Sequence, residues 1–375
     1  MPSKSKQFFD TVFDYDASST TYNNRTIEAM SVIGTSFTCL GATADYLYLG
    51  SDDRFDMAVF DIDAAGDLGA LTWEYYNGST WAQFHPASDQ FAVDPDGDDF
   101  GLTYKFDKDG VEVFPPSRLA SWTTETINSA NKYWVRVRSA SSVSTAPTVR
   151  RIQMRPVAAY CTSQDVFEFL QLSTVNGGTD FTASTVPTKA QVEDRIMAAQ
   201  SKIEYLSRKS FRPVVVTNEG HHFNLMGFKL DKSDPYKMLK HEVWDGGSWQ
   251  ARTEGRDNDY FLVPEIGMIY YARYFVLPAR FQNYNSPIWA YGGGEFSFSI
   301  RVSYLAGLNI HTDPEGPAAY DATVKWVASD LISNFDFGTF LVSGGNANIS
   351  GGEKVTQWKQ EAEDWAESLR QWESF

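Results

Sequence analysis

The sequence has few residues that could build a metal or disulfide centre. It contains only two cysteines among 375 residues, Cys39 and Cys161, and they lie far apart. One such pair supports neither a disulfide framework nor a cysteine zinc site. His85, His241 and His311 have no cysteine or carboxylate at ligand spacing, and the adjacent His221 and His222 would point to opposite faces of a strand. We therefore expect no metal centre and no cofactor.

Long apolar runs and catalytic signatures are also missing. No stretch approaches the roughly 20 apolar residues that cross a bilayer, and the basic N-terminus continues into Phe8, Phe9 and Asp10 rather than into a signal peptide. The sequence has no Gly-x-Ser-x-Gly elbow, phosphate-binding glycine loop or His-Glu-x-x-His helix. These absences predict no membrane contact and no catalytic residues. A paired-carboxylate glycosidase stays an alternative, because its two acids need no motif and the chain has 48 acidic residues.

Positive charge is in short supply relative to negative charge. Asp and Glu outnumber Lys and Arg by 48 to 32, which gives a formal net charge of -16. Attraction to phosphate backbones should be weak, so we expect no sequence-specific nucleic-acid binding. Two acidic loops, at 94–99 and 61–67, offer oxygen ligands for a hard cation but lack the EF-hand spacing. Solvated acidic turns are the favoured interpretation of both loops.

What the chain has in quantity is apolar and aromatic residues, at 42% and 15%. At this length two hydrophobic cores are expected, and together they predict a two-domain α+β protein. Residues 1–157 are predicted to form an all-β sandwich of jelly-roll type, because short alternating runs are broken by Gly, Asp and Pro. In this interpretation 149–154 is the hairpin partner of 133–138. Asn77-Gly78 is a second hairpin turn, with Trp73 and Trp81 on one surface.

Residues 158–375 change character and begin with helical signals. The pattern predicts helices at about 164–171, 189–211, 320–335 and 353–373, with strands at about 214–305 between the second and third. Pro213 is expected to limit the second helix and Asp321 to cap the third. A glycine-rich loop at 344–352 precedes the last helix.

The last predicted helix carries an apolar stripe at heptad-like spacing that includes three tryptophans. Its candidate interface residues are Trp358, Trp365, Leu369 and Trp372. A helix with this face exposed would be poorly soluble. Packing within the chain and docking onto a neighbouring subunit are both open interpretations of the stripe.

The order of elements from Tyr160 onward is similar to that of the head-tail connector (head-completion adaptor) proteins of tailed phages. The elements that match are the short helix at 165–170, the helix at 191–211 with its basic turn Ser207-Arg208-Lys209, and the strand at 300–307. That strand ends in Tyr304-Leu305-Ala306-Gly307, and a further helix follows at 322–335. The resemblance covers the C-terminal half and implies a virion neck protein assembled in the host cytoplasm. It implies a homo-oligomeric ring, of twelve copies, between the portal protein and head-completion, tail or neck proteins. Arg208 and Lys209 join the Trp stripe as interface candidates.

The N-terminal half resembles a β-sandwich module of phage baseplate and other virion proteins. The resemblance rests on 71–81, on Val113-Phe114-Pro115-Pro116 with Trp122, and on 133–137. It implies an outward decoration of the adaptor. The alternative function is a carbohydrate-binding baseplate or host-recognition component, in which Trp81 and Trp122 stack on sugar rings. Packing of these tryptophans in the core or against a hairpin is the competing interpretation.

Overall fold

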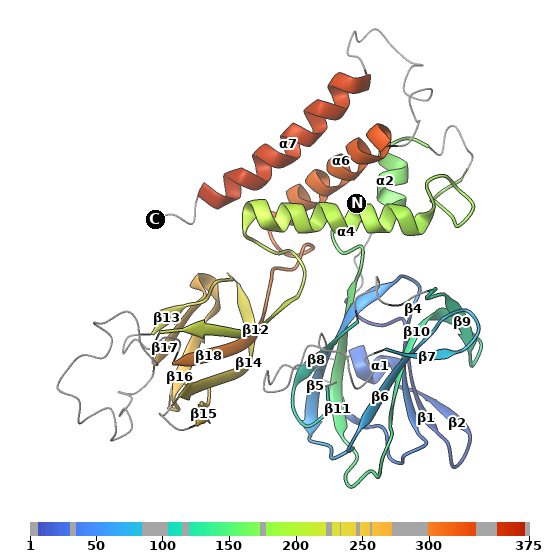
Figure 1. The fold of residues 1–375 in the computed structure, drawn as a ribbon, viewed down its shortest axis with the longest axis vertical. Coiled ribbons are helices and arrows are strands. Elements are labelled where there is room, and N and C mark those ends of the chain that lie inside the picture. Colours follow the sequence, from blue (N-terminus) through green and yellow to red (C-terminus); the bar gives the residue numbers. More distant parts are fainter. Residues whose placement is uncertain are drawn as a thin grey trace, which may run out of the picture.

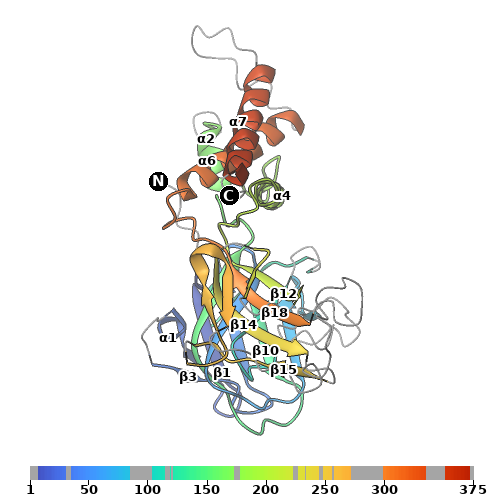
Figure 2. The same cartoon turned by 90° about the vertical axis from the view of Figure 1, so that its left-hand side faces the viewer.

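The protein divides into helices and two β units, so the predicted α+β class is confirmed (Figure 1). The computed structural model describes residues 7–30, 35–84, 104–114, 119, 121–172, 178–222, 227–232, 234–244, 248–255, 257–271, 299–334 and 351–371, and at 351–353 and 370–371 the backbone only. Helices gather at one end, and two β units lie side by side below them (Figures 1 and 2). We call these parts the helical part, the sandwich and the β insert.

The sandwich consists of two antiparallel sheets that enclose one core. The seven-stranded sheet has the order β2-β1-β4-β10-β6-β7, with β9 paired to β10. Its strands are β1 (Thr11–Asp16), β2 (Thr21–Asn24), β4 (Tyr46–Ser51), β6 (Leu71–Tyr76), β7 (Trp81–Phe84), β9 (Thr124–Ile127) and β10 (Ala130–Ser139). The four-stranded sheet has the order β3-β11-β5-β8. Its strands are β3 (Phe37–Thr38), β5 (Phe55–Ala64), β8 (Gly110–Val113) and β11 (Thr148–Pro156), and a short helix α1 (Thr26–Met30) contacts β11.

Alternation along the strands decides which side chains enter this core. Leu47 and Leu49 of β4 point inward with Val135 and Val137 of β10, and all four are fully buried. Their neighbours in sequence therefore lie on the outer face of the seven-stranded sheet.

Two of the predicted hairpin details are wrong. Strands β10 and β11 belong to different sheets, because the chain crosses from one layer of the sandwich to the other between them. In the hairpin of β6 and β7, Trp73 pairs with Phe84, whereas Trp81 pairs with Tyr76. Trp73 and Tyr76 are three residues apart on β6, so their side chains point to opposite faces of the sheet. Trp73 therefore enters the core, whereas Trp81, the partner of Tyr76, lies on the outer face.

The β insert contains two small antiparallel sheets that share a core. One has the order β12-β18-β14-β15, from β12 (Val214–His221), β14 (Pro235–Trp244), β15 (Trp249–Ala251) and β18 (Ile300–Ala306). The other has the order β13-β17-β16, from β13 (Phe228–Lys229), β16 (Tyr260–Val263) and β17 (Met268–Tyr271), with a 3-10 turn η2 (Pro264–Ile266). Trp244 and Trp249 pair across the hairpin of β14 and β15, with ring centroids 5.5 Å apart.

Among the described residues, the helical part consists of α2 (Ser163–Phe169), α4 (Lys189–Ser207), α6 (Gly316–Asn334) and α7 (Gly351–Gln371). Thr162 and Thr188 each form a capping box at the start of α2 and α4. Helix α4 ends four residues before the predicted end, because Arg208 adopts a left-handed conformation with φ 59°. Asp321 does not cap α6, which begins at Gly316; instead it pairs with Lys325 one turn later. None of the described helices is long and apolar enough to cross a membrane.

Candidate assembly surfaces and the junction of the three parts

Helix α7 packs along α4 and α6 of its own chain. Ala362, Ala366 and Leu369 are buried against these helices. The Trp358 ring lies 4.9 Å from the ring of Phe169, and the Trp365 ring lies 6.2 Å from that of Phe211. The predicted stripe thus makes contacts within the chain, while Trp372 lies outside the described residues. Both described tryptophans stay partly exposed at the edge of this packing.

The two basic side chains of the turn after α4 differ, because only Lys209 has an ion-pair partner among the described residues. Arg208 is exposed, whereas the Nζ of Lys209 lies 3.1 Å from a carboxylate oxygen of Glu315, just before α6.

The chain then runs to β12 beside Gly307, the glycine of the Tyr-x-x-Gly ending of β18. Gly307 has φ 120°, and a Cβ there would lie 2.2 Å from the carbonyl oxygen of Arg212. Only glycine permits this close approach, which holds the two connections to the β insert together.

A largely buried carboxylate, with 14% of its side chain exposed, fixes the end of α4. Glu204 accepts hydrogen bonds from Arg212 Nε at 2.7 Å, Tyr160 Oη at 2.9 Å and Ser210 Oγ at 3.0 Å. Burial by itself would raise the pKa of Glu204, but the Arg212 charge and these hydrogen bonds hold it below its usual value. The group is therefore a charged structural anchor. It is not poised to exchange a proton near neutral pH.

The connection from the sandwich to α2 is clamped by another α4 side chain. Gln200 is fully buried, and its Oε1 accepts hydrogen bonds from the backbone nitrogens of Ala159 and Tyr160 at 2.6 and 2.7 Å. Its Nε2 donates to the Val157 carbonyl at 3.0 Å. Since three backbone groups of this connection bind one amide, the sandwich enters the helical part in a fixed direction.

Arg54, on the turn between β4 and β5, makes a second link from the sandwich to α4. Its Nε lies 2.7 Å from Glu193, and its Nη2 lies 3.2 Å from both Asp194 and the Ala190 carbonyl. Burial raises the pKa of Glu193, although the nearby Arg54 charge opposes this. These contacts act at the N-terminal half of α4, so both halves of the helix are tied to the body.

The sandwich also packs directly against the β insert through a cluster that we call the aliphatic seam. Met57 and Val59 of β5 and Val111 of β8 meet Leu305 of β18, and all four are buried. Val113, Val215 and Leu239 are partly buried around them. The outer face of the four-stranded sheet is therefore covered by the same chain.

Ion pairs border the aliphatic seam. Lys237 of β14 contacts Asp61 of β5 and lies 2.9 Å from Asp109. Arg155 of β11 holds Asp56 at 2.7 Å and donates to the Pro213 carbonyl of the β insert at 2.6 Å. Sequence reasoning missed these pairs, because the partners lie 50 or more residues apart and no local pattern joins them.

The outer face of the seven-stranded sheet carries a different cluster, which we call the aromatic face. Phe13, Tyr48 and Trp134 are buried there, although no second layer of the described chain covers them. Tyr15, Tyr22, Tyr46 and Trp81 surround them and are partly exposed. Gly50 makes room for Trp134, since a Cβ at this position would lie 2.3 Å from the indole ring.

Arg136 organises the aromatic face. Its guanidinium carbon lies 4.0 Å from the ring centroid of Trp81 and 4.3 Å from that of Tyr46, and its Nε binds Glu74 at 2.8 Å. Trp122, the other predicted sugar contact, lies in the sandwich core with only 7% of its surface exposed, and its Nε1 donates to the Trp134 carbonyl. Trp122 is thus not available to a ligand. The aromatic rings of β4 and β7 hold an arginine of the same chain.

Asp61 and Asp63, which were predicted to lie in an acidic loop at 61–67, belong to strand β5 instead, and both form ion pairs. Asp61 binds Arg151 as well as Lys237, and Asp63 contacts Arg150 and accepts a hydrogen bond from Ser36. The other acidic loop, 94–99, lies outside the described residues, and so does His85. Among the residues that are described, no group of three or more His, Cys, Asp or Glu side chains could hold a metal ion.

Buried polar groups in the β insert form a structural cluster around His241. Burial lowers the pKa of His241 to about 3, with the charges of Arg252 and His221 adding to the effect, so the ring is neutral. Its Nε2 lies 3.3 Å from Tyr271 Oη, whereas Nδ1 has no hydrogen-bond partner among the described residues. His221 contacts Glu219, which also accepts a hydrogen bond from Tyr304.

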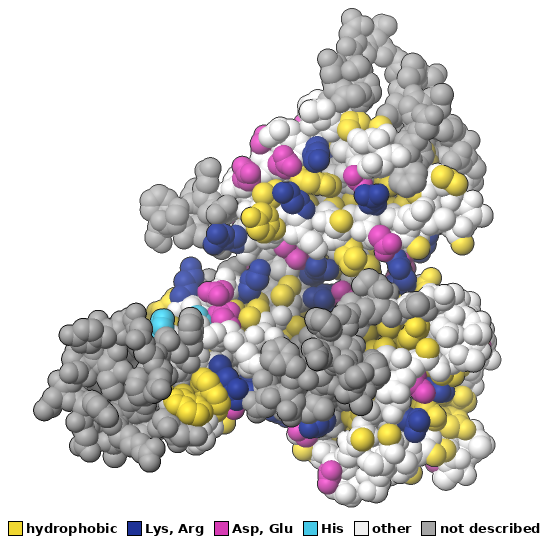
Figure 3. Space-filling view, viewed as in Figure 1, with side chains coloured by type: hydrophobic (Ala, Val, Ile, Leu, Met, Phe, Trp, Pro, Cys, Tyr) yellow, Lys and Arg dark blue, Asp and Glu magenta, His cyan; other side chains and the backbone are white. Residues whose placement is uncertain are grey.

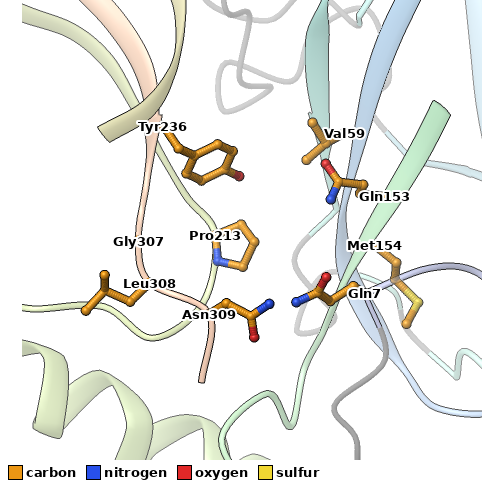
Figure 4. A pocket seen from close by; sticks show the side chains of 9 residues that line it. All are labelled: Gln7, Val59, Gln153, Met154, Pro213, Tyr236, Gly307, Leu308 and Asn309. Carbon is orange, nitrogen blue, oxygen red and sulfur yellow. The ribbon is translucent and has the colours of Figure 1, made fainter. Parts of the chain in front are cut away.

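A cavity of about 280 Å³ lies where the three parts meet (Figure 4). Its polar groups are the amides of Gln7, Gln153 and Asn309 and the hydroxyl of Tyr236, and Val59, Met154, Pro213 and Leu308 contribute apolar surface. Gln7 and Asn309 point toward each other across it (Figure 4). The described residues that line the cavity include no carboxylate, histidine or cysteine.

Comparison with known proteins adds little. No protein-family model and no curated protein matches the chain. A chain from the neck of an empty gene transfer agent (GTA) particle is 15% identical, with a TM-score of 0.31, over 54% of this chain and 90% of its own length. A chain from the virion of a native GTA particle is 13% identical, with a TM-score of 0.28, over 53% and 92%. At such low identities and TM-scores, neither likeness carries an argument about this chain.

Proposed function

We propose that the chain is a structural virion protein, a head-tail adaptor that forms a ring between the portal and the neck or tail. The sandwich is a rigidly attached decoration of that ring. Support comes from the order of elements after Tyr160, which resembles the adaptor family. The structure adds a physical reason for one shared feature, because the glycine of the Tyr-x-x-Gly ending is required by the close approach of Gly307 to Arg212.

The observation that carries the proposal is the joining of the three parts into one scaffold. Arg54 and Gln200 tie the sandwich to α4, Glu204 and Arg212 tie α4 to the β insert, and the aliphatic seam joins the β insert back to the sandwich. Each part is thus fixed to both others. A protein that couples the motions of its neighbours needs this stiffness, whereas an enzyme of this size would need a cleft with convergent reactive groups.

In this proposal α4, α6 and α7 together form the ring wall. The sequence left open whether the last helix docks within the chain or on a neighbour. Its buried face is occupied by α4 and α6, so the outer face of α7 is the part that would meet a partner. The seam sets the direction of the sandwich, which would project from each subunit at one fixed angle.

Negative-stain electron microscopy of the full chain, alone and mixed with the portal, tests this proposal. Closed rings of the free protein, or an added collar on the portal, are the expected results, and either gives the subunit number. Mass photometry of the same samples provides an independent count. Monomers that leave the portal bare would overturn the proposal.

A further inference from the structure

We infer that neighbouring subunits dock head to tail through opposite charges. This inference rests on the proposed function, in which the protein forms a ring. In this interface the basic outer ridge of α4 on one copy packs against the acidic outer ridge of α7 on the next. Both ridges lie on the helical part, and both face away from the helix contacts inside the chain. The partner at each ridge is a second copy of this chain.

The basic ridge lies on the C-terminal half of α4. Buried α4 residues such as Ile196 and Ile203 define the inner face, and Ala198, Ser201 and Tyr205 lie on the opposite side. The Tyr205 side chain is 76% exposed. A phenol side chain that faces water on a helix surface contributes no stability through burial. The small residues at 198 and 201 would allow another helix to approach closely beside it.

Two cations flank Tyr205 on this ridge. Lys202 lies with its Nζ 5.8 Å from the Tyr205 ring, and Arg208 is exposed at the C-cap. Within the part of the chain that the structure describes, neither has a carboxylate within ion-pair distance. They differ in this respect from Lys189, Arg195 and Lys209, which are all paired.

The acidic ridge lies on the C-terminal half of α7. Ala362, Ala366 and Leu369 face inward, so Gln360, Asp364 and Glu367 lie on the opposite side, and all three are exposed. Asp364 accepts a hydrogen bond from Gln360 at 2.7 Å, and no basic side chain among the described residues pairs with Asp364 or Glu367. Figure 3 shows Asp and Glu side chains along the upper edge of α7, and Lys and Arg side chains with acidic ones among them at and below the level of α4.

Charge complementarity selects a second copy as the occupant. The formal net charge of -16 makes two copies repel each other overall, so association needs a local contact of opposite sign. One chain supplies both signs, on two different surfaces. A contact between different surfaces is heterologous and continues from copy to copy until it closes into a ring, whereas pairing of identical surfaces would stop at a dimer.

Charge reversal tests the interface. Lys202→Glu with Arg208→Glu makes both ridges acidic, and Asp364→Lys with Glu367→Lys makes both basic. Each double variant is expected to need on the order of tenfold or more protein to assemble. An equimolar mixture of the two is expected to restore rings of alternating subunits, because each contact then joins opposite charges. The readouts are mass photometry of the free protein and collar occupancy on the portal by electron microscopy.

Matched controls carry the same net-charge changes at exposed sites elsewhere. Lys105→Glu with Lys229→Glu, and Asp107→Lys with Asp257→Lys, should assemble as the wild type does. Circular dichroism of every variant checks that it folds. Rings that form normally from either ridge variant, or a mixture that fails to assemble while both variants are folded, would overturn this interface and leave the proposed function standing. Wild-type chain that forms neither ring nor collar would instead overturn the proposed function.

Discussion

The two outer faces of the sandwich are buried by different means. On the four-stranded sheet, aliphatic side chains such as Met57, Val59 and Val111 are covered by Leu305 of the β insert. On the seven-stranded sheet, Trp134 is fully buried among its described neighbours on the same surface, and Arg136 lies between Tyr46 and Trp81. Within the described residues, one face is covered by a second layer of chain, and the other is not.

This difference follows from side-chain size and polarity. Val and Met are too short to cover one another on a flat sheet, so their burial requires another element at sheet-packing distance. Trp, Tyr and Arg are long and have polar tips, which allows them to lie across a sheet while their polar ends stay in water. The aliphatic seam therefore joins two parts of the chain, whereas the aromatic face stabilises one part. The predictions below separate these roles.

Removing the central ring of the aromatic face should have the largest effect. Trp134→Ala is expected to lower the free energy of unfolding by about 3–5 kcal/mol, because a fully buried indole leaves a cavity over Gly50. Trp81→Ala, on the partly exposed rim, should cost about 1 kcal/mol. Urea denaturation followed by circular dichroism measures both. Equal losses would contradict the idea that the face has a buried centre and an exposed rim.

Truncating a side chain of the aliphatic seam should lower the free energy of unfolding by less than Trp134→Ala does, but it should loosen both the sandwich and the β insert. Leu305→Ala is expected to destabilise the protein by about 2–3 kcal/mol, since Leu305 is fully buried between β5, β8 and β18. Hydrogen exchange should then speed up in β5 of the sandwich as well as in β18. Faster exchange in the β insert alone would show that the seam does not couple the two parts. Ile27→Ala, at an 83% exposed position, serves as the control.

The ion pairs that border the aliphatic seam should make a pH-dependent contribution to the free energy of unfolding. Burial raises the pKa of Asp61, but Lys237 and Arg151 more than offset this and lower it in the folded protein. The contribution is therefore present above the pKa of the unfolded chain, about 3.9, and is lost as the pH falls through the lower folded value. Asp61→Asn should cost about 1.5–2 kcal/mol at pH 7. The gap between wild type and variant in denaturation midpoints should narrow in acid; a gap that widens there would contradict the assignment.

The smallest expected effect is at Arg136. Arg136→Lys keeps the charge but loses the planar group between Tyr46 and Trp81, for a cost of about 0.5–1 kcal/mol. Because Trp81 gains contact with water, its fluorescence emission should shift to longer wavelength. Arg150→Lys, at a side chain that is 53% exposed, should change neither quantity. An unshifted emission in Arg136→Lys would show that the guanidinium does not cover the indole.

Local patterns predicted much of the fold but not the partners of each strand. Steps of three and four located α4, and the two Thr caps agree with its start and with that of α2. The same reasoning made 149–154 the hairpin partner of β10 and placed Trp73 and Trp81 on one face. Both errors concern pairing between strands, which alternation along one strand does not specify. Tyr46 and Tyr48 are two residues apart on β4, and Trp134 and Arg136 are two residues apart on β10. Each pair therefore lies on one face of its strand, and this spacing was a usable signal for the aromatic face because β4 and β10 are neighbours.

The candidate surfaces were also predicted only in part, because the sequence identified side chains on one helix face but not what they contact. The sequence placed Trp358, Trp365 and Leu369 on one helix face, and the tertiary structure decided that this face meets α4 and α6. It also revealed that Trp122 is a core residue and that Arg54, Arg155 and Lys237 join separate parts.

By itself the sequence determined the α+β fold class, the approximate positions of the main helices and the small number of cysteine and histidine residues. These properties depend on composition and on periodicities of a few residues. Only the tertiary structure decided which faces of the helices and sheets are covered and which charges are left unpaired, because burial depends on chain segments that lie far apart in the sequence.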